Sequence, residues 1–143
     1  MKDNLEQTLV IFKPDALRRK LVGEIMNRFE RVGLELTALK TIRFTEELCR
    51  EHYQHLVEKS FFPEIVRYMT SGPSIVGILS GYRAVAVVRH LVGATDPLEA
   101  APGTIRADYA LSNRENVVHA SATIPEAQAE ITRFFGAEFS TDL

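Results

Sequence analysis

The order of strand-like and helix-like segments constrains the fold of this chain more than any other feature. Short apolar or alternating runs predict strands at residues 8–12, 34–44, 74–79 and 117–119. Amphipathic periodicity predicts the main helices at residues 23–32, 84–92 and 124–135. In chain order, these strands and helices form two split β-α-β units. We therefore predict a ferredoxin-like α/β sandwich with a βαββαβ core, in which helices pack on one face of a four-stranded antiparallel sheet.

Other segments add to this core. Residues 46–59 and 61–69 predict extra helices between the second and third strands, and residues 94–114 form a long segment rich in turn residues. A loop of that length in a compact domain is usually functional or disordered. Because a sheet of this kind often leaves a face or an edge to cover, we also expect a homo-oligomer.

Composition limits the classes of protein that fit. A chain of 143 residues suits one domain, which we place at residues 1–143. The formal net charge of -2 gives no reason to expect nucleic acid or an anionic membrane as a partner. Cys49 is the single cysteine, no apolar run is long enough to span a bilayer, and the polar start does not resemble a signal peptide. We predict a cytoplasmic protein.

A histidine follows a short apolar run near the end of the chain. Asn116 precedes His119 by three residues, and Ser121 follows it by two. A neutral imidazole is a base and a nucleophile that can carry a phosphoryl group. For a histidine considered alone, a buried ring satisfied by a hydrogen bond is the simpler interpretation. Its neighbours in the predicted fold favour the chemical one.

Several cations are predicted at strand and loop ends. Lys13 follows the first strand, Arg89 lies on a helix, and the long loop contains Thr95 and Arg106. Each alone is more simply a solvated surface group. Together with His119 they suit phosphate oxygens, which guanidinium and ammonium groups bind well.

Aromatic residues give a further indication. Phe61, in the segment Phe61-Phe62-Pro63, can provide a stacking wall for a base, and the Tyr53 hydroxyl can reach a phosphate. Core packing is the alternative for both. The chain has no glycine-rich P-loop or dinucleotide fingerprint. Glu51, His52 and His55 have some metal-ligand character, but we favour a solvated helix face for them.

These residues occur in motifs that identify a family. The chain resembles the nucleoside diphosphate kinases over nearly its whole length, and its last motif is similar to their N-x-x-H-G-S-D signature. The matching segments, in family order, are residues 11–16, 61–63, 68–73, 93–97, 101–109 and 116–121.

The resemblance implies a ferredoxin-like enzyme that moves the γ-phosphoryl group of a nucleoside triphosphate, typically ATP, to a nucleoside diphosphate, with low base specificity and through a phosphohistidine. It implies that His119 is the nucleophile, oriented by Glu130 with support from Ser121. The implied nucleotide ligands are Tyr53, Arg89, Thr95 and Arg106 for phosphates, Lys13 and Asn116 for the sugar, and Phe61 and Ile65 for the base. Lys13 and Asn116 thereby also join the catalytic set. Mg²⁺ is expected to arrive with the nucleotide, without protein ligands. The family also implies a tetramer or hexamer.

Two positions depart from the family pattern. Ala120 replaces the usual glycine and Ala122 the usual aspartate. An alternative is therefore a catalytically weakened nucleotide-binding regulatory protein of the same fold. A third interpretation is a phosphohistidine carrier with a protein acceptor. We expect Thr123 to cap the last helix in place of the missing carboxylate.

Overall fold

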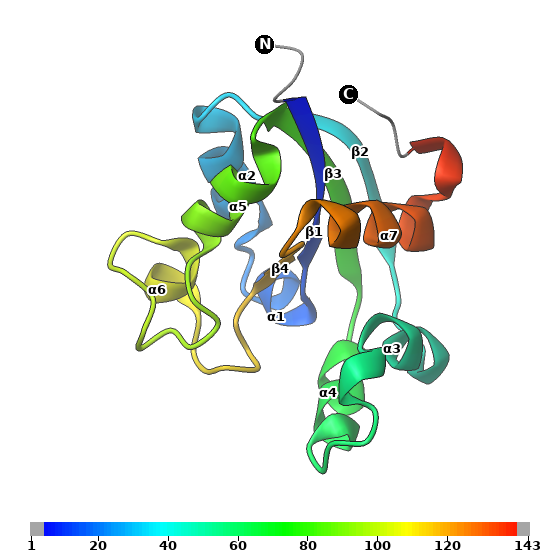
Figure 1. Ribbon diagram of the computed structural model, residues 1–143. Coiled ribbons are helices and arrows are strands. Elements are labelled where there is room, and N and C mark those ends of the chain that lie inside the picture. Colours follow the sequence, from blue (N-terminus) through cyan, green and yellow to red (C-terminus); the bar gives the residue numbers. More distant parts are fainter. Residues whose placement is uncertain (1–4, 140–143) are drawn as a thin grey trace.

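A single antiparallel sheet organises the computed structural model, which describes residues 5–139 (Figure 1). Its strands are β1 (Leu5–Phe12), β2 (Glu35–Ile42), β3 (Ser74–Tyr82) and β4 (Val118–Ala120), arranged in the order β2-β3-β1-β4. Every neighbouring pair is antiparallel. The predicted ferredoxin-like topology is confirmed, with the long strands β1 and β3 at the centre.

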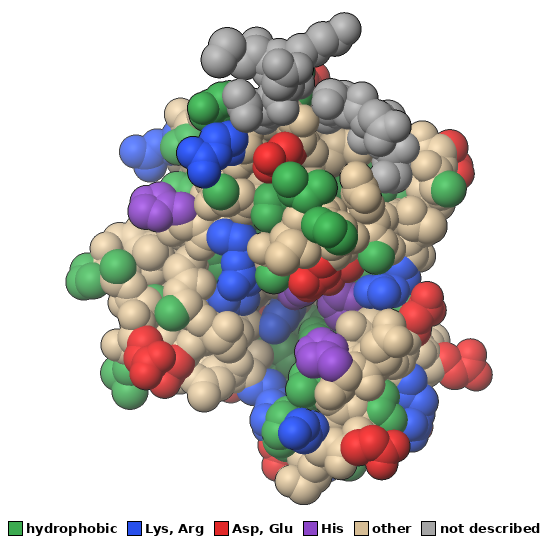
Figure 2. Space-filling view, viewed as in Figure 1, with side chains coloured by type: hydrophobic (Ala, Val, Ile, Leu, Met, Phe, Trp, Pro, Cys, Tyr) green, Lys and Arg blue, Asp and Glu red, His purple; other side chains and the backbone are tan. Residues whose placement is uncertain are grey.

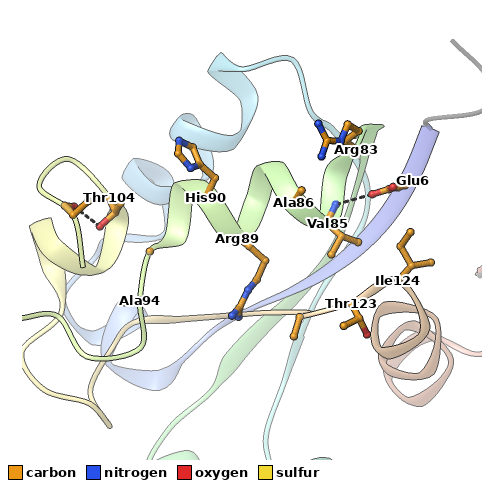
Figure 3. A pocket seen from close by; sticks show the side chains of 13 residues that line it. Glu6, Arg83, Val85, Ala86, Arg89, His90, Ala94, Thr104, Thr123 and Ile124 are labelled. Carbon is orange, nitrogen blue, oxygen red and sulfur yellow. Dashed lines mark hydrogen bonds between the residues drawn. The ribbon is translucent and has the colours of Figure 1, made fainter. Parts of the chain in front are cut away.

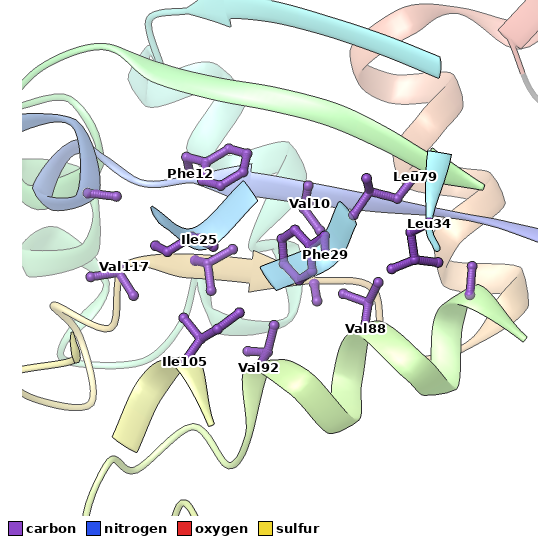
Figure 4. Packing of buried hydrophobic residues seen from close by; sticks show 14 residues of the cluster. Val10, Phe12, Ile25, Phe29, Leu34, Leu79, Val88, Val92, Ile105 and Val117 are labelled. Carbon is purple, nitrogen blue, oxygen red and sulfur yellow. The ribbon is translucent and has the colours of Figure 1, made fainter. Parts of the chain in front are cut away.

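Two helices cover one face of the sheet. They are α2 (Val22–Arg31) and α5 (Ala84–Val92), the crossover helices of the two β-α-β units. Val10 and Phe12 point from β1 into this layer, where they meet Ile25 and Phe29 of α2 and Val88 of α5 (Figure 4). All five side chains are fully buried, so this face forms a dry core.

The other face also carries helices, beyond the layer that the pattern predicted. These are α7 (Ile124–Phe135), α3 (Glu46–His52) and α4 (Phe62–Met69). Leu9 and Ile11, which alternate with Val10 and Phe12 along β1, pack here against Ile131 of α7. Strand β1 is apolar on both sides because both of its sides are covered.

Two short helices were not predicted. α1 (Pro14–Arg18) begins at Pro14, whose fixed φ suits the first helical position. α6 (Ile105–Tyr109) interrupts the segment predicted as a loop, and the Thr104 hydroxyl accepts a hydrogen bond from the Ala107 amide at its start.

The helix predicted at 46–59 ends early, at His52, and the 3-10 turn Gln54–Leu56 follows it. A second 3-10 turn, Ala137–Phe139, follows α7. Within residues 5–139, no helix combines the length and apolar character needed to cross a membrane.

Candidate active site

A cavity of about 520 Å³ opens beside β4, between α3, α4, α7 and the segment that contains α6. Figure 2 shows a hollow on this side of the molecule, in which basic, acidic and histidine side chains meet. The volume suits a small organic ligand. Ten of the eleven residues predicted for the site line it: Lys13, Tyr53, Phe61, Ile65, Arg89, Thr95, Arg106, Asn116, His119 and Glu130.

The eleventh, Ser121, lies behind the cavity wall and acts on Glu130. Its buried hydroxyl donates to Glu130 Oε1 at 2.6 Å. His119 Nε2 lies 2.9 Å from Oε2 and 3.0 Å from Oε1 of the same carboxylate. Strand β4 places His119 and Ser121 two residues apart, and therefore on the same side of the sheet as α7.

The protonation of this pair follows from its contacts. Burial would raise the pKa of Glu130, but the hydrogen bonds from His119 and Ser121 lower it to about 2. An ionised carboxylate only accepts hydrogen bonds, so Nε2 of His119 carries a proton and donates to it. No hydrogen bond from residues 5–139 reaches Nδ1, so the lone pair of that nitrogen has no donor within this part of the chain.

The backbone just before His119 makes an unusual turn. Val117 has φ 64°, and the Val118 amide bonds to the Asn116 carbonyl at 2.8 Å, which is a classic γ-turn. Such a conformation costs about 1–3 kcal/mol for a side chain branched at Cβ. The Lys13 amide, bonding to the Val117 carbonyl at 2.9 Å, and complete burial of the Val117 side chain hold it in place. This turn lay inside the strand predicted at 117–119, and no local signal in the sequence indicates it.

Lys13 and Asn116 form a polar pair at one wall of the cavity. Lys13 Nζ donates to Asn116 Oδ1 at 2.7 Å. Burial, and after it the charge of Arg106, lower the pKa of Lys13 to about 7, while Asp15 acts in the opposite direction. The ammonium is therefore short of counter-charge, which an anionic ligand would supply.

Arg106 and Arg89 add positive charge beside this pair. Arg106 is buried and donates to the carbonyls of Val118 at 2.7 Å and Gly93 at 3.1 Å, which ties α6 to β4 and α5. Burial and Arg89 lower the pKa of Arg106 to about 10, so it stays charged at neutral pH. Arg89 reaches toward the Ala120 carbonyl at 3.5 Å. Thr95 lies on the loop that joins α5 to α6, and it lines the cavity together with both arginines.

The opposite end of the cavity is apolar and aromatic. Phe61 keeps 36% of its surface exposed, and Ile65 is buried behind it. The Arg114 guanidinium lies 5.5 Å from the centre of the Phe61 ring and forms an ion pair with Glu64. Tyr53 lines the part of the cavity nearer to His119. Burial raises the pKa of its phenol. One end of the cavity therefore suits an anion and the other a flat ring.

One prediction on this face is wrong. We interpreted His52 as part of a solvated helix face, but it is 6% exposed and its ring centre lies 4.9 Å from that of His119. Along the chain it follows the charged residues Arg50 and Glu51, which are typical of an exposed helix face, so local patterning could not indicate burial. The cause is long-range, because the end of α3 packs against α7.

His52, His119 and Glu130 are the one group within residues 5–139 whose ligand atoms are close enough for a metal ion, all within 4.8 Å. Hydrogen bonds already engage two members of this group, however. Arg133 Nη1 lies 3.0 Å from His52 Nδ1, and Glu130 is bonded by both His119 and Ser121. The cations at the other wall give no carboxylate cage, so the described residues do not offer Mg²⁺ a site of their own.

The two departures from the motif are accommodated without strain. Ala120 lies within β4 opposite Val10, and it is not among the residues with positive φ. Thr123 caps α7, its hydroxyl accepting from the Glu126 amide at 3.2 Å. Ala122 and Arg89 also line a second, more open cavity of about 790 Å³. There Arg89 extends from α5 toward the segment that enters α7, while Glu6 bonds to the Val85 amide (Figure 3).

Known proteins match this chain over nearly all of it. A family model described as nucleoside diphosphate kinase matches residues 6–139. A nucleoside diphosphate kinase of Thermus thermophilus is 52% identical over 134 residues, which is 94% of this chain and 98% of that protein. One from Acetivibrio thermocellus is 49% identical over 131 residues, covering 92% of this chain and 96% of that protein.

Solved structures agree. The nucleoside diphosphate kinase of Aquifex aeolicus superposes with a TM-score of 0.89 at 39% identity, covering 96% of this chain and 99% of that one. The enzyme of Encephalitozoon cuniculi gives a TM-score of 0.91 at 38% identity, covering 95% and 92%. The similarity therefore extends over sequence and fold alike.

Proposed function

The chain belongs to the nucleoside diphosphate kinase family, and we propose that it transfers phosphoryl groups between nucleotides through a phosphohistidine at His119. The observation that carries this proposal is the His119–Glu130–Ser121 chain of contacts, which leaves the Nδ1 lone pair of His119 free beside a cationic wall. The proposed substrates are ATP and other nucleoside triphosphates as donors, and nucleoside diphosphates as acceptors.

In the first half-reaction, His119 Nδ1 attacks the γ-phosphorus of the donor. The N–P bond forms as the bond from phosphorus to the β,γ-bridging oxygen breaks, and the nucleoside diphosphate leaves. Glu130 accepts the Nε2–H bond throughout and offsets the positive charge that develops on the ring. Ser121 keeps the carboxylate oriented, since its hydroxyl donates to Oε1 at 2.6 Å.

In the second half-reaction, a terminal oxygen of the acceptor diphosphate attacks the phosphorus, and the N–P bond breaks. One site thus serves both nucleotides in turn. We assign phosphate contacts to Tyr53, Arg89, Thr95 and Arg106, and sugar contacts to Lys13 and Asn116, with Lys13 also near the transferred group.

We assign the base to Phe61 and Ile65. Stacking on a ring tolerates every base, because each has a π-face, so low base specificity follows. Mg²⁺ bound between nucleotide phosphates would supply further charge neutralisation, and the protein's own residues leave that role to the nucleotide.

Several wider properties belong to the same proposal. We propose one domain over residues 1–143 and a homo-oligomer, tetramer or hexamer. An oligomer would cover the outer edge of β2, where Leu39 is 49% exposed. A cytoplasmic location agrees with the lone, buried thiol of Cys49.

The first experiment is the intact mass of the purified protein after incubation with Mg-ATP, and again after addition of GDP. We expect a gain of one phosphoryl group that disappears with GDP as GTP forms. An adduct that GDP cannot discharge would indicate a carrier for a protein acceptor. Nucleotide binding without any adduct would indicate the regulatory alternative and overturn the kinase mechanism.

His119→Gln is the matched variant, since it keeps a polar side chain of similar reach. We expect it to bind ADP, gain no mass with Mg-ATP, and lose all turnover. Ping-pong turnover in this variant would contradict the assignment of the nucleophile.

A further inference from the structure

His52 is the ionisable side chain nearest to the nucleophile that the proposed mechanism does not use. It ends α3, and its ring meets the His119 ring edge to face, with centres 4.9 Å apart and planes at 80°. Phe44, Tyr53 and Phe134 surround the rest of the ring. His52 therefore has little freedom to move, and it forms one wall of the space that His119 occupies.

Arg133 determines the protonation of His52. Its Nη1 lies 3.0 Å from His52 Nδ1. A guanidinium only donates, so Nδ1 must accept, and the single proton of the neutral ring is on Nε2. Arg133 stands one turn after Glu130 on α7, and its Nε is 3.6 Å from Glu51 Oε1 on α3. The guanidinium is thus held between the same two helices that enclose His52.

We propose that His52, with its tautomer set by Arg133, is a positioning residue for the phosphorylated histidine. The edge-to-face contact keeps His119 in the rotamer in which Nε2 meets Glu130 and Nδ1 is left for the phosphoryl group. This inference rests on the proposed role of His119. It assigns to His52 and Arg133 an effect on the rate of phosphorylation, and none on nucleotide affinity.

The neutral charge of His52 is part of this role. A ring nitrogen of His52 lies within 4.8 Å of ligand atoms of both His119 and Glu130. A protonated His52 would be a second cation beside Glu130 and would compete with His119 for the carboxylate. The groups that face His52 are His119 from β4, Glu130 and Arg133 from α7, Glu51 and Tyr53 from the end of α3, and Lys13.

The balance of these groups keeps the ring neutral. Burial is the largest cause that lowers the pKa of His52, to about 3, and the charges of His119, Arg133 and Lys13 act in the same direction. Glu130 alone opposes them. Removing Arg133 takes away one positive charge and frees Nδ1 to bind a proton, so it must raise the pKa of His52.

The first test replaces the ring. His52→Gln keeps a neutral polar group without the edge-to-face contact, and His52→Phe keeps a ring. With Mg-ATP at saturation, we expect the single-turnover rate constant for phosphorylation to fall at least tenfold in His52→Gln. In His52→Phe, we expect at least half of that loss, on a logarithmic scale, to be recovered. Kd for ADP, from calorimetry, should stay within twofold in both. A wild-type rate in His52→Gln, no recovery in His52→Phe, or a parallel loss of affinity would overturn the proposal.

The second test replaces Arg133, the residue that sets the tautomer of His52. In Arg133→Met, we expect the acid limb of the pH–rate profile for phosphorylation to move up by at least one pH unit. His52→Phe combined with Arg133→Met should lack this shift, because no ring is left to titrate. Arg50→Met is the matched control, since Arg50 pairs with Glu46 on the same helix α3, away from the site. Coincident profiles for Arg133→Met and the wild type would overturn the proposal.

Nitrogen-15 NMR of the histidine rings provides a readout that does not depend on catalysis. We expect His52 to be neutral with its proton on Nε2 at pH 7, and to become cationic at a higher pH in Arg133→Met than in the wild type. A cationic His52 in the wild type would overturn the inference. Failure of the wild type to gain a phosphoryl group would instead overturn the role of His119, so the two failures are distinguishable.

Discussion

At the scale of single residues, Lys13 shows how the site is prepared for an anion. Its ammonium is buried beside Arg106, donates to Asn116 at 2.7 Å, and has a pKa lowered to about 7 from 10.5. The unfolded chain therefore binds more protons than the folded chain between about pH 7 and pH 10.5. It follows that the contribution of Lys13 to stability becomes more favourable as pH rises through that window.

Nucleotide binding should reverse this situation. Phosphate charge near Lys13 raises its pKa, so we expect binding of ADP at pH 7 to take up about half a proton. Calorimetry in two buffers of different ionisation enthalpy, such as PIPES and Tris, measures this number directly. Lys13→Gln should remove the uptake. An observed binding enthalpy that is the same in both buffers for the wild type would contradict the buried, half-neutral lysine.

At the scale of elements, α7 matters most, because it carries both Glu130 and Arg133. Thr123 starts it by accepting from the Glu126 amide, and buried Ala127, Ile131 and Phe134 fix it on the sheet. The cap therefore contributes to stability, while the packed face positions the Glu130 carboxylate beside His119.

Thr123→Ala separates these two contributions. We expect it to lower the free energy of unfolding by about 1 kcal/mol, the usual cost of a lost cap, and to leave the phosphorylation rate at 25 °C within twofold. Urea denaturation measures the first quantity and rapid quench the second. Thr45→Ala, which removes the equivalent cap of α3, is the control and should give a similar loss. A much larger fall in rate for Thr123→Ala would mean that the cap itself positions Glu130.

The elements also show what the sequence could predict. α5 and α7 have a long apolar period and clear ends, and both were placed within a residue of their observed bounds. α6 spans five residues, too few for periodicity, so its only local signal was the capping Thr104. The end of α3 at His52 was missed because its charged neighbours follow the pattern of an exposed helix.

In the candidate site, too, some features could be predicted from the sequence and others could not. Ten residues assigned through the family resemblance line one cavity, because the fold brings the segments that carry them together. The γ-turn at Val117 and the burial of His52 depend on contacts between segments far apart in the chain, such as Lys13 with Val117 and α3 with α7. Local patterns carry no information on such contacts.

At the scale of the whole molecule, strand β1 joins two cores. Val10 and Phe12 pack with Ile25 of α2 on one face, and Leu9 and Ile11 pack with Ile131 of α7 on the other. The sheet lies between Ile25 and Ile131, and they belong to different clusters. Each cluster nevertheless needs β1 in its native register, so the two faces should unfold together.

Ile25→Ala, Ile131→Ala and the double variant test this architecture. Both side chains are fully buried, so each substitution should cost about 2–5 kcal/mol. Because the two sites share no direct partner, the double variant should lose the sum of the single losses within about 0.5 kcal/mol, in one urea transition. Protein concentration must be held constant, since any self-association would stabilise the folded state by mass action. Two separate transitions would contradict this expectation. If Ile131→Ala shifted only one of them, and nucleotide binding were lost in that transition, α7 and the Glu130 carboxylate would unfold independently of the α2–α5 layer.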